Sequence, residues 1–438
     1  MSNTGDSYAS WGRYPPSRPG MTRHLRWRSE RLPACDLPML PYGNGRSYGD
    51  SCLNNGGVLV DMRGLDRFIS FDRERGILTC EAGVLFADIL DLIVPAGWFL
   101  PVTPGTRFVT VGGAIANDVH GKNHHHAGTL GRHILAFELL RSDGSRRRCT
   151  PSENADWYGA TIAGLGLTGA VLLAEMQLQP IPGALMVVET IRMRGLDEFF
   201  DLSAESDADY QYTVAWVDCL ANGQSLGRGL FMRGNHAHGS PRARRRWQPA
   251  VPFSPPFPLV NGWSLKPLNA LYYHRQRRRC ARTLTSYESF FYPLDGVLHW
   301  NRLYGPKGFL QYQCVVPPAH AREVIRGLLD RISRANAGSV LSVLKMFGDK
   351  RSPGWLSFPR AGATLALDFP HRGKDTLRLL DELDGLVSEA GGAVYPAKDA
   401  RMSAERFHRY FPRWQDLEAY VDPAFSSSLW RRVAGDAA

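Results

Sequence analysis

Glycine-rich segments in the first half of the chain contain the residue types that bind phosphates and flat cofactors. The first segment has the sequence PYGNGRSYGD and covers residues 41–50. Its glycines at 43, 45 and 49 free the backbone to turn several N–H groups towards one point, and such a nest binds phosphate oxygens. Arg46 would add a positive charge and Ser47 a hydroxyl group. A phosphate site is one interpretation of this segment, and a tight surface loop is the other.

A second segment, from Pro104 to His126, includes Gly112-Gly113-Ala114. The lack of bulky side chains there allows a flat cofactor or a pyrophosphate to approach the backbone closely. His124, His125 and His126 suggest a metal site as an alternative. We expect no metal, because consecutive side chains in a strand or loop diverge and no group of carboxylates accompanies these histidines.

The third segment, GLGLTG at 164–169, matches the GxGxxG pattern of dinucleotide-binding Rossmann folds. That pattern must follow a strand and open a helix. The residues that come next, 171–178, have the composition of a strand and lead to Pro180. We therefore expect a turn over a cofactor rather than an NAD(P) site. Three such loops without a Rossmann unit fit an extended dinucleotide that lies across the domain.

Short elements must position these loops. Residues 58–61, 77–80 and 134–141 have the composition of strands between turn signals. Asp143-Gly144 predicts a hairpin turn after the last of these strands. Apolar residues at helical spacing from Phe86 to Ile93 predict a helix that ends before Pro95.

The pattern changes after about residue 185. Strands are expected at 212–217, 309–316 and 364–369, and amphipathic helices at 324–332 and 379–387. This order favours an α+β domain with an antiparallel sheet. We expect four parts: a flexible arm (1–30), a cofactor-binding domain (31–185), a substrate domain (186–394) and a C-terminal segment (395–438) that returns to the first domain. Prolines and arginines over 240–282 predict a mobile loop or lid.

Composition excludes several classes of protein. With 44% apolar and 21% charged residues, the chain of 438 residues is not mainly disordered. Its seven cysteines are scattered and odd in number, which predicts reduced thiols. No apolar stretch approaches the roughly 20 residues of a membrane span, and the polar N-terminus lacks a signal-peptide core, so the sequence favours a cytoplasmic protein.

Positive charge is concentrated in two arginine runs. The net charge is +10, and the runs lie at 242–246 and 275–282. A solvated loop is one interpretation, and contact with an anionic membrane surface or a phosphorylated substrate is the other. We do not expect nucleic acid, because no nucleic-acid motif accompanies the arginines.

Five longer motifs extend over both halves of the chain. They are GxGRSYGD at 43–50, GGAIAxDxHGKNHHxAG at 112–128, PLD at 293–295, WNRxYGPxGFLQYQ at 300–313 and AKDxR at 397–401. Through them, residues 25–435 resemble the vanillyl-alcohol-oxidase-like flavoproteins, and among these the decaprenylphosphoryl-β-D-ribose 2′-oxidase group. The resemblance implies an α+β fold with a two-part, PCMH-type FAD-binding domain and an α+β substrate domain.

The resemblance also implies which residues hold FAD. These are Gly43, Gly45, Arg46, Ser47, Tyr48, Gly49, Gly105, Thr110, Gly112, Gly113, Asn117, Val119, His120, Val171 and Tyr395. Many members of the wider superfamily bind flavin covalently through a histidine near the first loop. Ser47-Tyr48-Gly49 stands at that place here, so we expect non-covalent FAD.

For the reaction, the resemblance implies Lys398, His120, Lys345 and Gln313 as catalytic residues. A lysine beside the flavin can stabilise negative charge or hold the reacting oxygen, and His120 or a lysine could take the proton. The substrate pocket would contain Trp216, Phe291, Gln311, Phe347, Thr364 and Ala366. Alternation along a strand puts Gln311 and Gln313 on one face.

The expected activity is FAD-dependent oxidation of a secondary sugar hydroxyl to a ketone. A polyprenyl-phosphate-linked pentose is the expected substrate, as half of a 2′-epimerisation in cell-wall biosynthesis that a short-chain reductase partner completes. Thr364 and Ala366 stand where the close family often has Asn and Cys, and Phe291 where it often has Tyr. A soluble sugar, aldonolactone or natural-product tailoring oxidase is therefore the alternative. The family adds peripheral contact with the membrane or cell envelope as an alternative to a purely cytoplasmic location.

Overall fold

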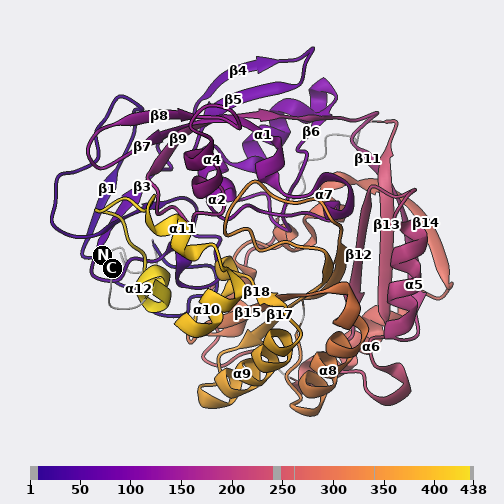
Figure 1. Cartoon of the computed structure of the whole chain (residues 1–438). Helices are drawn as coiled ribbons and strands as arrows, with labels where there is room; N and C mark the ends of the chain where they lie inside the picture. The colour runs from indigo at the N-terminus through magenta and orange to yellow at the C-terminus, as the bar shows by residue number, and fades with distance from the viewer. Residues whose placement is uncertain (1–7, 240–247, 261, 340, 435–438) are drawn as a thin grey trace.

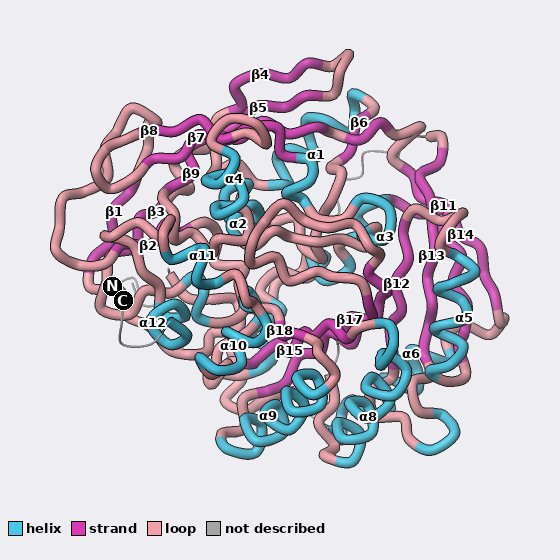
Figure 2. The backbone as a smooth tube through the Cα atoms, viewed as in Figure 1, coloured by secondary structure: helices cyan, strands magenta, loops and turns pink. Residues whose placement is uncertain are grey.

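Two large sheets and the loops between them dominate the computed structural model of the chain (Figure 1). The structure describes residues 8–239, 248–260, 262–339 and 341–434. Loops fill much of the space between the sheets, and helices lie both in this central region and on the outer side of the larger sheet (Figure 2). The cofactor-binding loops of the sequence analysis all come from this central region.

The N-terminal half contains two sheets. A parallel sheet has the order β1 (Met21–His24), β3 (Val58–Asp61) and β2 (Met39–Tyr42). An antiparallel sheet has the order β4 (Phe68–Asp72), β5 (Ile77–Glu81), β9 (Ala170–Gln177), β7 (Ile134–Leu140) and β8 (Arg146–Cys149). Strands β6 (Trp98–Phe99) and β10 (Gln179–Pro180) form a small pair. The strand that follows GLGLTG is β9, so the Rossmann interpretation is excluded as expected.

Four helices belong to this half: α1 (Phe86–Ile93), α2 (Val111–Ala116), α3 (His124–Ala127) and α4 (Ala155–Thr161). Helix α1 buries Phe86, Ile89, Leu90 and Ile93, the residues whose spacing predicted it. A turn with Pro95 follows the helix directly, as predicted. Together with β5, β7 and β9, these apolar side chains form one continuous core.

An eight-stranded antiparallel sheet forms the second half. Its order is β14 (Cys280–Ser286), β11 (Leu185–Met193), β13 (Gly229–Ala237), β12 (Tyr212–Val217), β16 (Ser342–Phe347), β17 (Gly362–Pro370), β15 (Phe309–Val316) and β18 (Ala393–Val394). The helices of this half are α5 (Leu196–Ser206), α6 (Gly262–His274), α7 (Tyr287–Phe291), α8 (Ala321–Arg334) and α9 (Lys374–Glu389).

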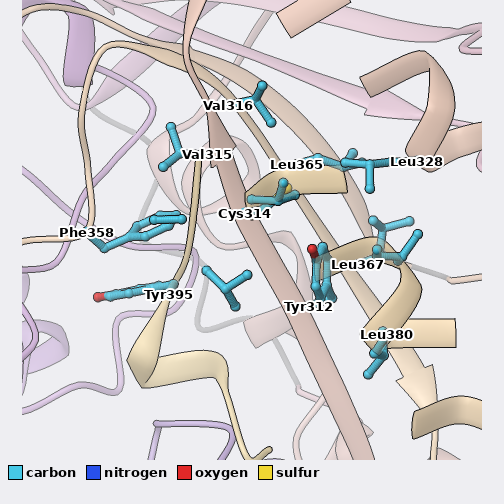
Figure 3. Packing of buried hydrophobic residues seen from close by; sticks show 14 of the residues in the cluster. Tyr312, Cys314, Val315, Val316, Leu328, Phe358, Leu365, Leu367, Leu380 and Tyr395 are labelled. Atoms are coloured by element: carbon cyan, nitrogen blue, oxygen red, sulfur yellow. The ribbon is translucent and has the colours of Figure 1, made fainter. Parts of the chain in front are cut away.

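Helices α8 and α9 cover one face of this sheet. In Figure 3, Leu328 of α8 and Leu380 of α9 lie near Leu367 of the sheet, and Phe358 stacks with Tyr395 nearby. All eight residues of β15 are buried. Helices α8 and α9 pack on the strand, and its residues Gln311 and Gln313 line the site.

The C-terminal segment returns to the N-terminal half through α10 (Ala404–Tyr410), α11 (Trp414–Glu418) and α12 (Ser428–Ala434). The Met39 N–H donates a hydrogen bond to the Ala424 carbonyl, and the Met39 carbonyl accepts one from the Ser426 N–H. Phe407 and Tyr410 of this segment are buried.

Two sequence predictions fail in the structure. Residues 21–24 form β1, and Leu25 is buried, so a flexible arm does not describe this part of 1–30. Helix α6 and the start of β14 occupy much of 262–282, where prolines were expected to exclude regular structure. The helix accommodates Pro267 because its other face buries Leu265, Asn269 and Tyr273. The first arginine run lies outside the described residues.

Two other features concern the whole chain. All seven cysteines are free thiols, as predicted. Within the described ranges, no helix combines the length and apolar composition that a bilayer span requires. The division of the chain into four parts stays a prediction.

Candidate active site

A cavity of about 710 Å³ lies between the glycine-rich loops and one face of the eight-stranded sheet. Small-molecule sites typically have about 300–1,000 Å³, so this volume suits a large cofactor together with a substrate. The loops at 41–52 and 103–122 form one side, and strands β12, β15, β16 and β17 contribute the other. The turn at 395–398 closes the cavity.

Close packing explains the glycines of the first loop. A Cβ atom on Gly43 would lie 2.3 Å from the Thr110 hydroxyl, and one on Gly49 would lie 1.5 Å from the Asp399 carbonyl oxygen. Gly45 has a φ of +58°, which favours glycine. The loop therefore touches both the second glycine-rich segment and the turn at 396–399.

Thr110 caps helix α2 within the second segment. Its hydroxyl accepts a hydrogen bond from the Gly113 N–H at 3.2 Å, and so it fixes the first turn of α2. Gly112 packs against Ala82 with no room to spare. A Cβ on Gly105 would meet nothing within 4 Å, so this part of the loop borders open cavity space.

Several buried polar atoms on the cavity wall have no hydrogen-bond partner among the described residues. They are Nε of Arg46, Oγ of Ser51, Oδ1 of Asn117 and Nδ1 of His120. Buried polar groups without partners are costly, and in native proteins they are rare. A cofactor with phosphate, hydroxyl and ring-nitrogen groups would supply the missing partners. The residues therefore fit FAD, whose pyrophosphate would lie at the first loop.

Arg46 lies close to two aromatic rings. Its guanidinium lies 4.1 Å from the centre of the Trp11 ring and 5.3 Å from that of Phe108. Burial lowers the pKa of Arg46, but an arginine this basic stays charged. The sequence analysis missed Trp11, because it lies in the segment that was expected to be a flexible arm.

His120 and Gln313 meet at the centre of the cavity wall. The Gln313 amide nitrogen lies 2.9 Å from Nε2 of His120 and 3.2 Å from the Thr364 hydroxyl. Burial lowers the pKa of His120 well below its usual value, and the nearby Lys345 lowers it further. The ring is therefore neutral. If Gln313 donates to Nε2, the ring proton lies on Nδ1, the atom without a partner.

Lys398 lies between Tyr48 and a buried acid. Its Nζ is 3.9 Å from the centre of the Tyr48 ring. Burial lowers the pKa of Lys398 to about 7, although the negative charge of Asp368 acts to raise it. Asp368 is fully buried on β17 and accepts a hydrogen bond from Gln311 at 2.6 Å. Burial raises the pKa of Asp368 to about 7.

Two further lysines line the cavity. Lys345 donates to the Gly121 carbonyl at 3.3 Å, and Lys122 donates to the Phe291 carbonyl at 3.1 Å. Burial lowers the pKa of Lys345 to about 8 and that of Lys122 to about 7. Sequence reasoning missed Lys122 and Asp368. The motif HGKNHH contained a signal for Lys122, whereas Asp368 becomes visible only when β15 and β17 pair.

Most of the residues singled out from the sequence share this cavity. Those that line it are Gly43, Gly45, Arg46, Ser47, Tyr48, Gly105, Thr110, Gly112, Gly113, Asn117, Val119, His120, Val171, Trp216, Phe291, Gln311, Gln313, Lys345, Thr364, Ala366, Tyr395 and Lys398. Two others do not line it. Gly49 packs against the backbone of Asp399, and Phe347 lies behind His120, with ring centres 4.9 Å apart.

The three histidines lie in α3 and not in a strand or loop, so the reason given for their divergence is wrong. Neighbouring histidines of this helix nevertheless contact different residues. His124 packs on Phe347, and His125 contacts the Tyr210 carbonyl at 3.0 Å. No group of three or more His, Cys, Asp or Glu side chains in the described residues is arranged to hold a metal ion.

Comparisons with known proteins agree with the fit of this cavity to FAD. Residues 29–150 match the family model described as an FAD binding domain. The chain is 38% identical over 411 residues to decaprenylphosphoryl-β-D-ribose oxidase of Mycolicibacterium smegmatis, covering 89% of this chain and 88% of the relative. It is 38% identical over 370 residues to an uncharacterised protein of Streptomyces coelicolor, covering 79% and 98%. L-Gulonolactone oxidase of Mus musculus is 31% identical over 138 residues, covering 32% and 31%.

Proposed function

Because this chain belongs to the family of FAD-dependent oxidoreductases that includes decaprenylphosphoryl-β-D-ribose oxidase, we propose that it oxidises a secondary hydroxyl of a sugar to a ketone. The sugar is a pentose linked to a polyprenyl phosphate. The observation that carries the proposal is that Lys398, His120 and Gln313 line the same cavity as the glycine-rich loops. A redox cofactor and a proton acceptor are thereby brought to one substrate.

FAD, when bound, would supply the two-electron acceptor that this oxidation requires. The protein must remove the hydroxyl proton. Lys398 suits this role, since an amine with a pKa of about 7 is about half uncharged at neutral pH. The His120 ring, held at Nε2 by Gln313, donates from Nδ1 to an oxygen atom and fixes the sugar. The charge on Lys345 would stabilise negative charge that develops beside it.

FAD is bound without a covalent link in this proposal, because Ser47 and Tyr48 stand at the place where covalent relatives carry histidine. A short-chain reductase would return the ketone to an alcohol of opposite configuration and so complete an epimerisation. The enzyme would meet its lipid-linked substrate through peripheral contact with the membrane.

A soluble sugar or lactone is the second candidate substrate. Thr364 and Ala366 on the cavity wall favour it, because they differ from the residues common in the close family. The partial match to L-gulonolactone oxidase is compatible with it.

Anaerobic bleaching of the bound flavin tests the proposal. The purified holoenzyme is mixed with a polyprenyl-phosphoryl pentose, with the same sugar lacking its lipid, and with free sugars and aldonolactones. Bleaching by the lipid-linked sugar alone is the expected result. Bleaching only by a soluble compound would replace this substrate with the second candidate. Acid precipitation of the same sample should release all of the flavin, and yellow colour in the pellet would contradict non-covalent binding.

A further inference from the structure

The positive charge of this protein comes from one stretch of the chain. Residues 219–287 contain twelve Lys and Arg and no Asp or Glu. The remaining chain has 40 basic and 42 acidic residues, a net charge of −2, whereas the whole chain carries +10. This stretch includes α6 and the loop at 248–260 that leads to it. A segment this long without acidic residues favours an anionic partner.

Helix α6 has one buried and one exposed face. Leu265, Asn269 and Tyr273 are buried, and Tyr273 packs with Trp216 and Leu230 of the large sheet. The exposed face carries Leu268 and Leu271, which are 49% and 69% exposed. The inner face thus anchors the helix, while two leucines at a spacing of three residues point into solvent.

The loop before α6 also exposes apolar side chains. Phe253 is 69% exposed and Phe257 is 63% exposed. Together with Leu268 and Leu271 they account for four of the eleven large exposed apolar side chains of the described residues. Helix α6 lies on the opposite side of the view from the two chain termini (Figure 1).

Basic side chains also lie in α6 and directly after it. Lys266, Arg277 and Arg278 are exposed. Within the described part of the chain, no carboxylate forms a salt bridge with any of them. Their charge is therefore available to an external anion.

The cavity reaches the surface at the C-terminal end of α6. Tyr272 and Arg275 line it together with Trp216, Met232 and Thr283 of the sheet. Arg275 is exposed and lies 3.9 Å from the centre of the Tyr272 ring. The cavity thus extends from the glycine-rich loops to the basic end of this helix.

We propose that α6 and its preceding loop form a docking surface for an anionic lipid bilayer. The α6 surface consists of Phe253, Phe257, Leu268, Leu271, Lys266, Arg277 and Arg278. Its phenylalanines and leucines enter the interface between headgroups and acyl chains, and the basic residues contact anionic headgroups. Nucleic acid would also attract the cations, but its phosphates would gain nothing from exposed leucines.

This surface places the cavity opening beside the bilayer. A lipid-linked sugar could enter at Arg275 while its lipid stays in the membrane. That consequence rests on the proposed function, whereas binding to vesicles does not.

Cosedimentation of the full-length holoenzyme with vesicles tests the docking surface. Vesicles of phosphatidylcholine alone are compared with vesicles of phosphatidylcholine and phosphatidylglycerol in equal amounts. We expect binding to the anionic vesicles and release at high salt, because salt screens the contribution of the arginines. Leu268→Glu with Leu271→Glu, and separately Arg277→Glu with Arg278→Glu, should each reduce partitioning by at least about tenfold.

Matched controls lie elsewhere on the surface. Ile69→Glu on β4 and Arg378→Glu on α9 change an exposed apolar and an exposed basic residue outside the α6 surface. Both should bind vesicles like the unchanged protein. Equal losses in the α6 variants and the controls would overturn the proposal, as would binding to duplex DNA in place of vesicles.

The two proposals fail in different ways. If the α6 variants bind vesicles normally but the lipid-linked sugar still bleaches the flavin, the docking surface is wrong and the function stands. If vesicle binding depends on α6 but the lipid-linked sugar is not oxidised, the function is wrong and the surface stands. The α6 variants should retain flavin reduction by a detergent-solubilised substrate, because their substituted residues do not line the cavity.

Discussion

Burial and a neighbouring charge shift the pKa of Lys398 in opposite directions. Burial brings its pKa down to about 7, while Asp368 favours the charged form. If the uncharged amine takes the hydroxyl proton, flavin reduction should become faster as the pH rises through about 7. Lys398→Ala should keep its FAD and reduce flavin at least about 10²-fold more slowly. Stopped-flow absorbance checks both results, and normal reduction by the variant would remove Lys398 from the mechanism.

Asp368 is expected to influence the pH at which Lys398 loses its proton and can accept the hydroxyl proton. Asp368→Asn removes the charge that raises the pKa of Lys398, so the limb of the pH profile should move by about one unit to lower pH. The amide oxygen can still accept the hydrogen bond from Gln311. Asp349→Asn, at an exposed position, serves as the control. An unchanged profile in Asp368→Asn would show that this carboxylate does not influence the reacting group.

The site residues that the sequence predicted and those that it missed lie in different kinds of segment. Motif residues such as His120 and Lys398 lie within recognisable segments that turn at glycine or proline. Asp368 sits in a strand and has no motif of its own. It faces Gln311 only because β15 and β17 pair in antiparallel register, with these two residues opposite each other. Cross-strand neighbours of this kind depend on pairing that a single sequence does not specify.

At the scale of elements, the first glycine-rich loop and the turn that carries Lys398 pack with no spare room. The Tyr48 N–H donates to the Ala397 carbonyl at 2.9 Å, next to the contact between Gly49 and Asp399. Gly49→Ala should therefore separate the two segments, destabilise the fold by about 1–3 kcal/mol and weaken FAD binding. Thermal unfolding and flavin fluorescence measure these effects.

Gly385→Ala is the matched control for that substitution. Gly385 lies in α9, and a Cβ atom there would meet nothing within 4 Å. The substitution should stabilise the protein by about 0.5–1 kcal/mol, since alanine favours a helix over glycine. A similar loss of stability in both variants would mean that contact with Asp399 is not what requires glycine at position 49.

Elements with a regular pattern of apolar residues were the ones that could be predicted from the sequence. Strands β12 and β15 have the bounds expected from their apolar runs, because both lie in the interior of the sheet. Strand β1 was missed because its four residues are only half-buried or exposed. Helix α6 was missed because Pro267 interrupts its pattern, although tertiary contacts of Asn269 and Tyr273 hold it in place. Packing overrides local propensity in both cases.

At the scale of the whole molecule, helix α12 near the C-terminus is tied to two segments that border the cavity. Arg432 of α12 donates to both carboxylate oxygens of Asp50 at 3.0 and 2.8 Å and to Asp399 at 2.9 Å. Asp50 ends the first glycine-rich segment, and Asp399 follows Lys398. One arginine of α12 thus ties this segment to the turn that carries Lys398. We therefore expect FAD binding to depend on this link.

Arg432→Ala tests that dependence. Both carboxylates are buried, so loss of the arginine should cost about 3 kcal/mol of stability at pH 7 and weaken FAD binding. Burial acts to raise the pKa of Asp399, but Arg432 and Arg401 hold it below its usual value. The stability from this charged group is therefore present above its unfolded pKa and is lost as the pH falls through its folded pKa.

Without Arg432, protonation relieves buried carboxylates that have lost a charged partner, so the stability gap between variant and unchanged protein should narrow as the pH falls from 7 towards about 4. Urea unfolding across this range, with FAD titration at pH 7, provides the measurement. Arg413→Ala breaks an exposed pair with Asp416 and should cost less than about 1 kcal/mol at either pH. A stability gap for Arg432→Ala that stays constant with pH would mean that the arginine contributes by packing, and that its charge does not hold the segments of Asp50 and Asp399 together.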